Sequence, residues 1–451
     1  MQIPDFQGQV LTQQDEGYEQ ARSIWNGAID RHPALIARCT GTADVCAAVH
    51  WGRAQGLAAS VRAGGHGVAG TALVEGGLVI DVSGMKGIYV DPRRRRVWVQ
   101  AGVLLGELDR ETQQFGLAVP AGVISNTGVA GLTLGGGIGY LMRKHGLTCD
   151  NLVAAEVVTA EGKVVRASPE ENRDLLWGLQ GGGGNFGVVT TFEFQAQTIG
   201  PTVLAGPLIF AAEDAREVLE AYRSFMLNAP EEITTVMNLR WAPPAPWIPP
   251  ELHGREVIFV SCVYAGDVAN GEIAVKALRG LSSPLADLVK PMPFIDHQRM
   301  YDGAVPHGLG YYWKSPYLRD LDSNAINVLA GSAWEAASHR SYTIIFQMGG
   351  AVARLQADAS AFEDRTAALA PNINAVWERP TEPHPDIEWV RRRYKDLEPS
   401  STGKHYVNFQ SELDTVDAYG SRKYQRLAEL KRRWDPESFF HSTHAISPSV
   451  A

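Results

Sequence analysis

The stretch Arg62-Ala63-Gly64-Gly65-His66-Gly67 places one histidine inside a glycine-rich turn, directly after an apolar run. Two further glycine clusters follow, Gly135-Gly136-Gly137-Ile138-Gly139 and Gly181-Gly182-Gly183-Gly184-Asn185. Glycine accepts positive φ and lacks the Cβ that would hold a ligand away from the backbone. Successive backbone N–H groups in such turns form a concave site for phosphate oxygens. The three clusters therefore predict a domain that binds a large phosphate-bearing cofactor.

The segment Gly65-His66-Gly67-Val68-Ala69-Gly70 also satisfies the dinucleotide pattern G-x-G-x-x-G. That pattern needs a helix directly after its last glycine. Here residues 71–80 read as a loop followed by a strand, which disfavours a Rossmann nicotinamide site. Tight turns that bind no ligand remain a second alternative.

The composition bounds the class of protein. A chain of 451 residues is too long for one ordinary core, so two or three domains are expected. The net charge of -9 argues against a nucleic-acid partner, and Arg93–Arg96 reads as a solvated hairpin turn. The chain has no apolar run of the about 18 residues that a membrane span needs. The four cysteines fit neither a disulfide framework nor a zinc site, so we expect a reducing compartment and no bound metal. We also expect no signal peptide, and therefore a cytoplasmic protein.

The order of predicted elements indicates an α+β protein. Residues 1–198 read as short strands with few helices, including strands over 58–62, 78–81 and 187–194. Residues 199–403 read as an inserted domain with an antiparallel sheet and helices on one face. Its predicted strands are 234–240, 257–264 and 342–348, and its predicted helices include 214–226 and 268–281. Residues 404–451 return to a strand at 406–409 and a helix at 421–434.

Several motifs, in the same order along the chain, resemble the FAD domain of berberine bridge enzyme-like oxidoreductases, members of the vanillyl-alcohol oxidase group. They are Arg62–His66, Pro120–Gly122, Gly128–Gly139, Gly146–Asn151, Asp174–Gly187 and Tyr406–Phe409. The resemblance implies a PCMH-type FAD-binding domain of two α/β subdomains, completed by the C-terminal tail, with the substrate domain inserted between them.

The resemblance also implies FAD as cofactor and a covalent bond from His66 to the flavin. Ile124 stands where many family members have a second, cysteinyl link, so a single bond is expected. Thr127 falls at the family's oxygen-gate position, and its size implies that oxygen can enter. The implied cofactor-binding residues are Arg62, Ala63, Gly64, Gly65, His66, Gly67, Gly122, Thr127, Gly128, Gly131, Gly135, Gly136, Gly137, Gly139, Asn151 and Val189.

The candidate catalytic residues are Tyr406, Asn408 and Gln347. In a strand, Tyr406 and Asn408 would point to the same face, and the resemblance places that strand over the flavin. We expect Tyr406 to act as base or orienter and Asn408 as orienter. Gln347 is expected to lie at the bottom of the pocket. The aromatic-basic cluster Tyr311–Lys314 either lines the pocket or packs in the core.

These expectations add up to an FAD-dependent oxidase. A hydride would leave a C–H bond next to an alcohol or amine of a small aromatic or apolar substrate, and O2 would be reduced to H2O2. Three alternatives stay open: a dehydrogenase that uses a quinone or another acceptor, a sugar or oligosaccharide oxidase of the same family, and a flavin-binding protein without turnover. We expect a monomer or a homodimer.

Overall fold

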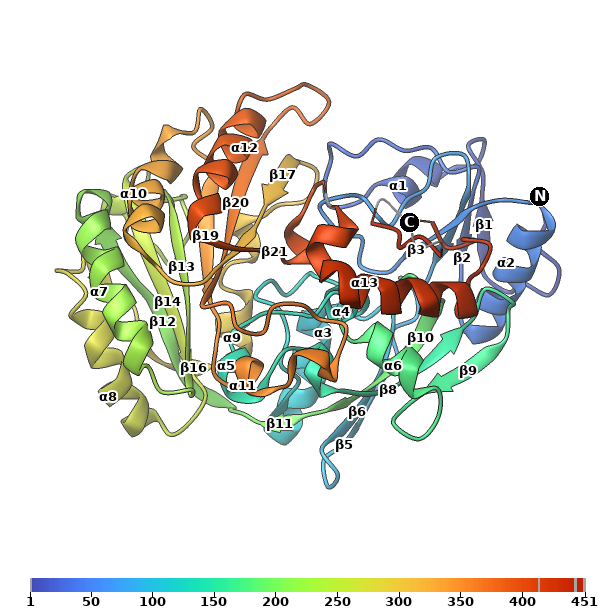
Figure 1. Ribbon diagram of the computed structural model, residues 1–451, viewed down its shortest axis with the longest axis horizontal. Coiled ribbons are helices and arrows are strands. Elements are labelled where there is room, and N and C mark those ends of the chain that lie inside the picture. Colours follow the sequence, from blue (N-terminus) through green and yellow to red (C-terminus); the bar gives the residue numbers. More distant parts are fainter. Residues whose placement is uncertain (1, 413, 442–443, 449–451) are drawn as a thin grey trace.

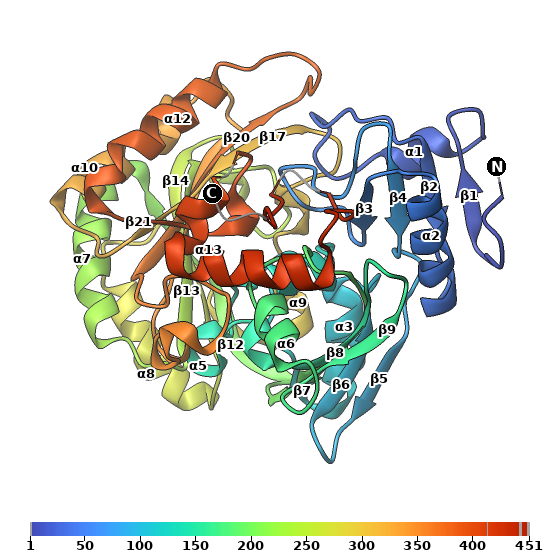
Figure 2. The same cartoon turned by 45° about the vertical axis from the view of Figure 1, so that its right-hand side comes forward.

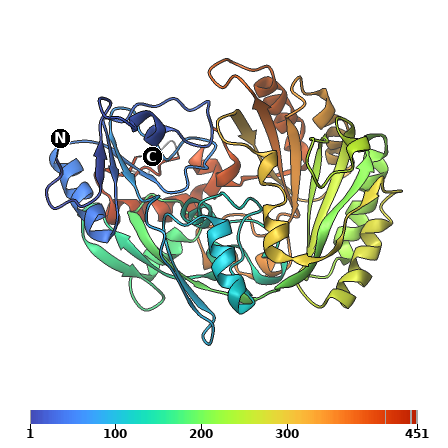
Figure 3. The same ribbon diagram turned by 180° about the vertical axis from the view of Figure 1, so that it is seen from behind.

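The chain folds into two halves that lie side by side in the computed structural model (Figure 1), which describes residues 2–412, 414–441 and 444–448. Among the described residues, one half holds a four-stranded and a five-stranded sheet and a short two-stranded sheet of β7 (Leu117–Ala118) and β11 (Gln197–Thr198), all built by the N-terminal residues. The other half holds one large sheet with helices on its outer face. Figure 3, the view from behind, shows the same two halves. The α+β class predicted from the sequence is confirmed.

The first small sheet leads directly into the glycine turn. Its strands, in the order β1-β2-β4-β3, are Gln9–Leu11, Leu35–Arg38, Leu78–Asp81 and Ala59–Arg62. The strands β2, β4 and β3 are parallel, and β1 is antiparallel to β2. Helix α2 (Thr42–Ala54) connects β2 to β3, as its helical spacing predicts. Because β3 ends at Arg62, the histidine turn begins at the carboxyl edge of this sheet.

The second small sheet is antiparallel throughout. Its strands, in the order β5-β6-β10-β8-β9, are Ile88–Asp91, Arg96–Gln100, Val188–Gln195, Leu152–Val158 and Val164–Ala167. Arg93, Arg94 and Arg95 form the exposed turn between β5 and β6, and Arg96 begins β6. Glu161-Gly162 lies in the turn between β8 and β9. Four helices accompany this sheet: α3 (Leu105–Thr112), α4 (Val129–Leu134), α5 (Met142–His145) and α6 (Arg173–Leu179).

The large sheet has the order β15-β12-β14-β13-β19-β20-β18-β21, with β16 also paired to β12 and β17 to β20. These strands are Ala286–Asp287, Thr202–Ala211, Glu256–Tyr264, Ile233–Trp241, Tyr342–Gln347, Leu369–Trp377, Pro316–Leu318, Ser401–His405, Lys290–Pro293 and Gly310–Lys314. Four helices cover its outer face (Figure 1): α7 (Ala215–Asn228), α8 (Val268–Arg279), α10 (Ser323–Ser332) and α12 (Asp386–Asp396). The inner face turns toward the N-terminal half and carries the site described below.

The C-terminal segment returns to the N-terminal half. Helix α13 (Thr415–Trp434), interrupted at Gly420, lies across that half in Figures 1 and 2. Its buried Lys431 donates from Nζ to the Asp435 carboxylate (2.6 Å) and to the carbonyls of Asn185 and Phe440. Beyond the helix, Ala59 of β3 donates to the carbonyl of Phe439 at 2.8 Å, so the tail extends the first small sheet. The boundaries at 198/199 and 403/404 stay predictions, and β21 spans the second of them.

None of the described helices combines the length and the apolar character that crossing a bilayer requires.

Candidate active site

The histidine turn lies backbone to backbone against a second glycine segment. A Cβ on Gly64 would lie 2.5 Å from the Cα of Gly128, so neither position tolerates a side chain. Gly65 has φ +65°, which only glycine adopts without strain. Among the described residues, the N–H groups of Gly64, Gly65 and Gly67 find no hydrogen-bond acceptor. Free, adjacent N–H groups in such a turn suit the polar oxygens of a bound cofactor.

The ring of His66 is held by stacking, and its Nε2 makes no hydrogen bond to the described residues. Its ring lies 4.3 Å from the ring of Trp25 at an interplanar angle of 14°, and Trp25 stacks in turn on Tyr311. Its Nε2 is buried and has no hydrogen-bond partner among the described residues. Burial lowers the pKa of His66 to about 4. The ring is therefore neutral at physiological pH, with a lone pair available on one nitrogen.

The structure divides the predicted cofactor-binding residues into two groups. Some face open space: Gly67 is exposed, Thr127 is half-buried, and a Cβ on Gly131 would meet no atom within 4 Å. The others are packed against protein. A Cβ would contact Leu132 at Gly122, Asn408 at Gly135, Phe362 at Gly136, Thr148 at Gly137 and the Ala121 carbonyl at Gly139.

Three predicted side chains are also engaged by the protein itself. Arg62 donates to the carbonyls of Ala21 and Ser23, near helix α1 (Tyr18–Arg22). Asn151 donates to the carbonyls of His145 and Leu147, and Val189 lies in the core. These residues position the backbone around the site, and their side chains do not face open space.

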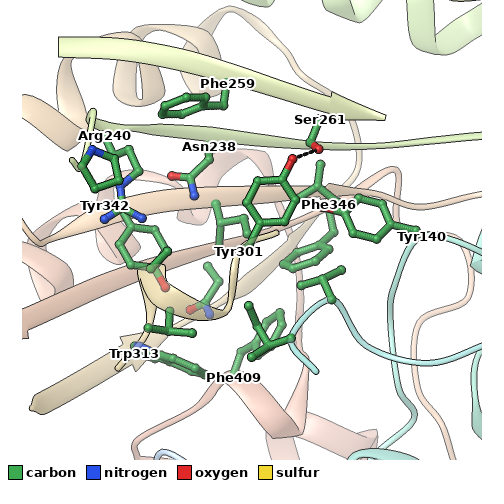
Figure 4. Close-up of a pocket in the computed structure, with 18 of the residues that line it drawn as sticks. Tyr140, Asn238, Arg240, Phe259, Ser261, Tyr301, Trp313, Tyr342, Phe346 and Phe409 are labelled. Atoms are coloured by element: carbon green, nitrogen blue, oxygen red, sulfur yellow. Dashed lines mark hydrogen bonds between the residues drawn. The ribbon is translucent and has the colours of Figure 1, made fainter. Parts of the chain in front are cut away.

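A large aromatic cavity opens beside His66, between the inner face of the large sheet and the N-terminal half (Figure 4). It has about 860 Å³ of empty space, its open mouth included. Alternate residues of two neighbouring strands project into it, Val236, Asn238 and Arg240 from β13 and Tyr342, Ile344 and Phe346 from β19. Its other large side chains are Tyr140, Trp247, Phe259, Tyr301, Trp313 and Phe409.

The tyrosines of this cavity are held neutral. Burial raises the pKa of Tyr342 to about 12 and raises the pKa of Tyr301 well above its ordinary value. Tyr301 and Ser261 share a hydrogen bond between their hydroxyl groups (Figure 4). No Asp, Glu or Lys belongs to the described cavity wall. The described wall thus offers a ligand hydroxyl, amide and guanidinium groups and carries no carboxylate base.

The expected role of Gln347 in the pocket is wrong. Its side chain accepts a hydrogen bond from Thr235 Oγ1 (2.7 Å), and Thr235 contacts Tyr222 of α7. Because Tyr342, Ile344 and Phe346 face the cavity, the next residue along β19 faces the helix-covered side of the sheet. Gln347 is therefore a buried polar residue of the opposite face.

The predicted strand at 406–409 is also wrong. The strand β21 ends at His405, and a single 3₁₀ turn, Val407–Phe409, follows Tyr406. Tyr406 is 1% exposed, and burial raises its pKa to about 12. Its hydroxyl accepts hydrogen bonds from the Gly137 N–H (2.9 Å) and from Asn408 Nδ2 (3.0 Å). Phe409, not Tyr406, reaches the cavity wall.

The cluster Tyr311–Lys314 is split by strand alternation. Trp313 lines the cavity, whereas the Tyr312 hydroxyl points to the other face and donates to Glu412. Sequence reasoning missed Asn238, Arg240 and Tyr301. The first two could have been found as polar residues at alternate positions of an otherwise apolar strand.

Comparison with known proteins agrees with this arrangement. Residues 33–168 match the family model for an FAD binding domain, and residues 405–447 match the model for berberine and berberine-like proteins. The FAD-linked oxidoreductase YgaK of Bacillus subtilis (strain 168) is 30% identical, with 99% of this chain and 98% of that protein covered. The chain belongs to the berberine bridge enzyme-like FAD-linked oxidoreductases. The protein is therefore an FAD-linked oxidoreductase.

Two further relatives show the range of this family. The crystal structure of 6-hydroxy-D-nicotine oxidase from Arthrobacter nicotinovorans matches with a TM-score of 0.87 at 27% identity, covering 99% of each chain. The xylooligosaccharide oxidase of Thermothelomyces thermophilus is 28% identical, with 95% of this chain and 90% of that protein covered. The names of these two oxidases refer to chemically distinct substrates.

The site of this berberine bridge enzyme-like protein fits FAD on its own geometry. The free N–H groups of the Gly64–Gly67 turn suit the cofactor's polar atoms, and a Cβ on Gly131 would meet no protein atom within 4 Å, so the backbone there is open to a ligand. The unpartnered Nε2 of His66 provides a nucleophilic nitrogen at the wall of the substrate cavity.

Proposed function

We propose that this oxidoreductase is an oxidase that carries FAD on a single covalent bond to His66. The observation that carries the proposal is the buried, unpartnered Nε2 of His66 in the wall of an aromatic cavity. A buried nitrogen without a partner is costly, and a bond to the cofactor would remove that cost. The stack on Trp25 fixes the ring plane, so the nitrogen keeps one direction.

When bound, FAD would accept a hydride from the substrate and pass two electrons to O2. The hydride from the C–H bond, the proton of the neighbouring hydroxyl or amine and one O2 together give H2O2, so atoms and electrons balance. Thr127 is half-buried and directly precedes Gly128, and the family resemblance places it at the oxygen-gate position, where a side chain of this size favours oxidase over dehydrogenase chemistry.

The residues of this chain would bind and orient the substrate. Aromatic walls from Tyr342, Phe346 and Trp313 hold a flat or apolar body and exclude water. The neutral hydroxyl groups of Tyr301 and Ser261 offer hydrogen bonds without adding charge. This lining suits a small aromatic or apolar alcohol or amine better than a long oligosaccharide.

Anaerobic mixing followed by admission of O2 tests the proposal. Alcohols, amines and oligosaccharides are mixed with the purified yellow protein, and bleaching of the flavin absorbance is recorded. We expect an aromatic or apolar alcohol or amine to bleach the flavin, O2 to restore the colour, and one H2O2 to form per turnover. Slow recovery in O2 with fast recovery in a quinone would show a dehydrogenase. If light reduces the flavin but none of the tested substrates bleaches it, the protein binds flavin without turnover.

A further inference from the structure

Arg240 places a positive charge inside the cavity without a carboxylate to balance it. The residue is 6% exposed, and its guanidinium lies 4.8 Å from the centre of the Tyr342 ring (Figure 4). Its Nε donates to the carbonyl of Trp241 at 3.3 Å. Among the described residues, no carboxylate forms an ion pair with Arg240 and none lines the cavity. Burying an unpaired charge costs free energy, so a structure retains one where a ligand supplies the counter-charge.

Two amides flank this end of the cavity. Asn238 of β13 pairs in register with Ile344 of β19, which pairs in turn with Asn372 of β20. Both asparagines line the cavity, and the side-chain oxygen of each is buried without a hydrogen-bond partner among the described residues. Each amide can also donate from its nitrogen to an anion. Arg240, Asn238 and Tyr342 lie close to one another in Figure 4, so cation, amide and aromatic ring converge there.

The charges outside the cavity do not cancel this one. Burial lowers the pKa of Arg240, and the nearby charge of Arg340 lowers it further. The guanidinium of Arg340 itself pairs with Glu378 at the surface (2.9 Å). The rest of the cavity wall is largely aromatic or aliphatic. The cavity therefore has one positively charged end, flanked by two amides, and is largely apolar elsewhere.

We propose that the substrates of this site are aromatic or apolar molecules that carry a carboxylate, which Arg240 binds. The inference rests on the proposed function and deepens it by naming the substrate class. A guanidinium donates two parallel hydrogen bonds to a carboxylate, and such charge-assisted bonds are strong away from water. The same charge repels a cationic group at this end of the cavity, so a protonated amine there is selected against.

Binding of a matched pair of probes to the purified holoenzyme tests the inference. Benzoate and benzamide have nearly the same shape and differ in charge, and isothermal titration calorimetry measures both without any turnover. We expect benzoate to bind at least tenfold more tightly than benzamide. Arg240→Gln should weaken benzoate at least tenfold and change benzamide less than twofold. Arg240→Lys should give an intermediate loss of benzoate affinity, because lysine keeps the positive charge but cannot donate two parallel hydrogen bonds to the carboxylate.

Arg340→Gln is the matched control, since it removes a neighbouring positive charge outside the cavity. It should change benzoate binding less than twofold, and thermal unfolding of each variant checks that the fold is kept. Equal binding of benzoate and benzamide by the wild type would overturn the inference. An equal loss of both probes in Arg240→Gln would overturn it as well.

Turnover separates this inference from the proposed function. The holoenzyme is mixed anaerobically with 4-(hydroxymethyl)benzoate or with 4-(hydroxymethyl)benzamide, and reduction of its flavin is followed by absorbance. We expect the ratio of the rate constant for flavin reduction to the substrate Kd to be at least tenfold higher for the acid, and this preference to be lost in Arg240→Gln. Equal reduction by both compounds, with equal binding of the two probes, would refute the substrate class and leave the oxidase intact. Arg240-dependent benzoate binding without flavin reduction by any substrate would refute the oxidase and retain the anion site.

Discussion

The hydroxyl of Tyr406 accepts a hydrogen bond from the backbone N–H of Gly137 at 2.9 Å. This bond joins the turn that follows β21 to the second glycine cluster, and Asn408 adds a second donor to the same oxygen. A tyrosine oxygen that already accepts two hydrogen bonds and lies out of the cavity is suited to positioning a loop. We therefore expect Tyr406 to hold residues 135–139 in place, which agrees with the orienting role and not with the base among the two roles that the sequence suggested.

Tyr406→Phe distinguishes these two roles. Removing the oxygen leaves the Gly137 N–H buried without its acceptor, which costs about 1–3 kcal/mol. We expect a lower unfolding temperature and less than a tenfold change in the rate constant for flavin reduction. Stopped-flow reduction and thermal unfolding measure the two effects. A reduction rate that falls by more than a hundredfold, with stability unchanged, would restore Tyr406 as the base.

His66→Ala should abolish covalent attachment of the flavin. The wild-type protein, precipitated with acid and run on a denaturing gel, should give a band with flavin fluorescence, and the variant band should be dark. His307→Ala is the matched control, because His307 is an exposed histidine close enough to affect the charge of His66. Its band should stay fluorescent. Wild-type flavin that washes away with acid would end the covalent proposal.

The sequence predicts the local elements well because each is encoded by neighbouring residues. The short apolar run Leu78–Asp81 becomes β4, and the helical spacing that begins near Ala43 becomes α2. The glycine turn at residues 62–67 is also where the motif places it, since its conformation depends on its own glycines.

The predictions that proved wrong concern features that depend on contacts between distant segments of the chain. Gln347 and Phe346 are adjacent on β19, and only the pairing of that strand with β13 and the helix layer behind it decides which one faces the cavity. Tyr406 and Asn408 do meet, as their spacing suggests, but through a 3₁₀ turn that follows the end of β21. The cavity itself is assembled from β13, β19, β20 and the turn at His66, which no local pattern brings together.

Gly131→Ala and Gly128→Ala should separate cofactor binding from folding. A Cβ at position 131 meets no protein atom within 4 Å, and alanine favours the helix α4 by about 0.5–1 kcal/mol. We expect the Gly131→Ala apoprotein to be as stable as the wild type, or more so, yet to contain less FAD, because the new methyl group enters the space assigned to the cofactor. A Cβ at position 128 would lie 2.7 Å from the Gly64 nitrogen, so that variant should lose stability as well.

The ratio of absorbance at the flavin and protein bands gives the FAD content, and thermal unfolding of the apoproteins gives stability. Normal FAD content in Gly131→Ala would show that the cofactor lies elsewhere.

Asp109 should make the folded protein less stable as the pH rises. It lies on α3 in full burial, and its Oδ2 accepts a 3.3 Å hydrogen bond from Gln298 of helix α9 (Phe294–Arg299). Burial raises the pKa of Asp109 to about 7, against the ordinary aspartate value near ~3.9 in the unfolded chain. Between these two values the folded state keeps a proton that the unfolded state has lost, so the free energy of unfolding falls with rising pH.

Asp109→Asn removes this titration while keeping the shape of the side chain. We expect the variant to match the wild type near pH 4 and to be more stable by about 2–4 kcal/mol at pH 8, since one pKa unit corresponds to ~1.4 kcal/mol. Denaturant unfolding at both pH values measures the difference. Asp267→Asn, at the exposed N-cap of α8, is the control and should show no such gain, because asparagine caps a helix as well as aspartate does. A variant that gains the same stability at both pH values would show that packing, not the proton, decides the effect.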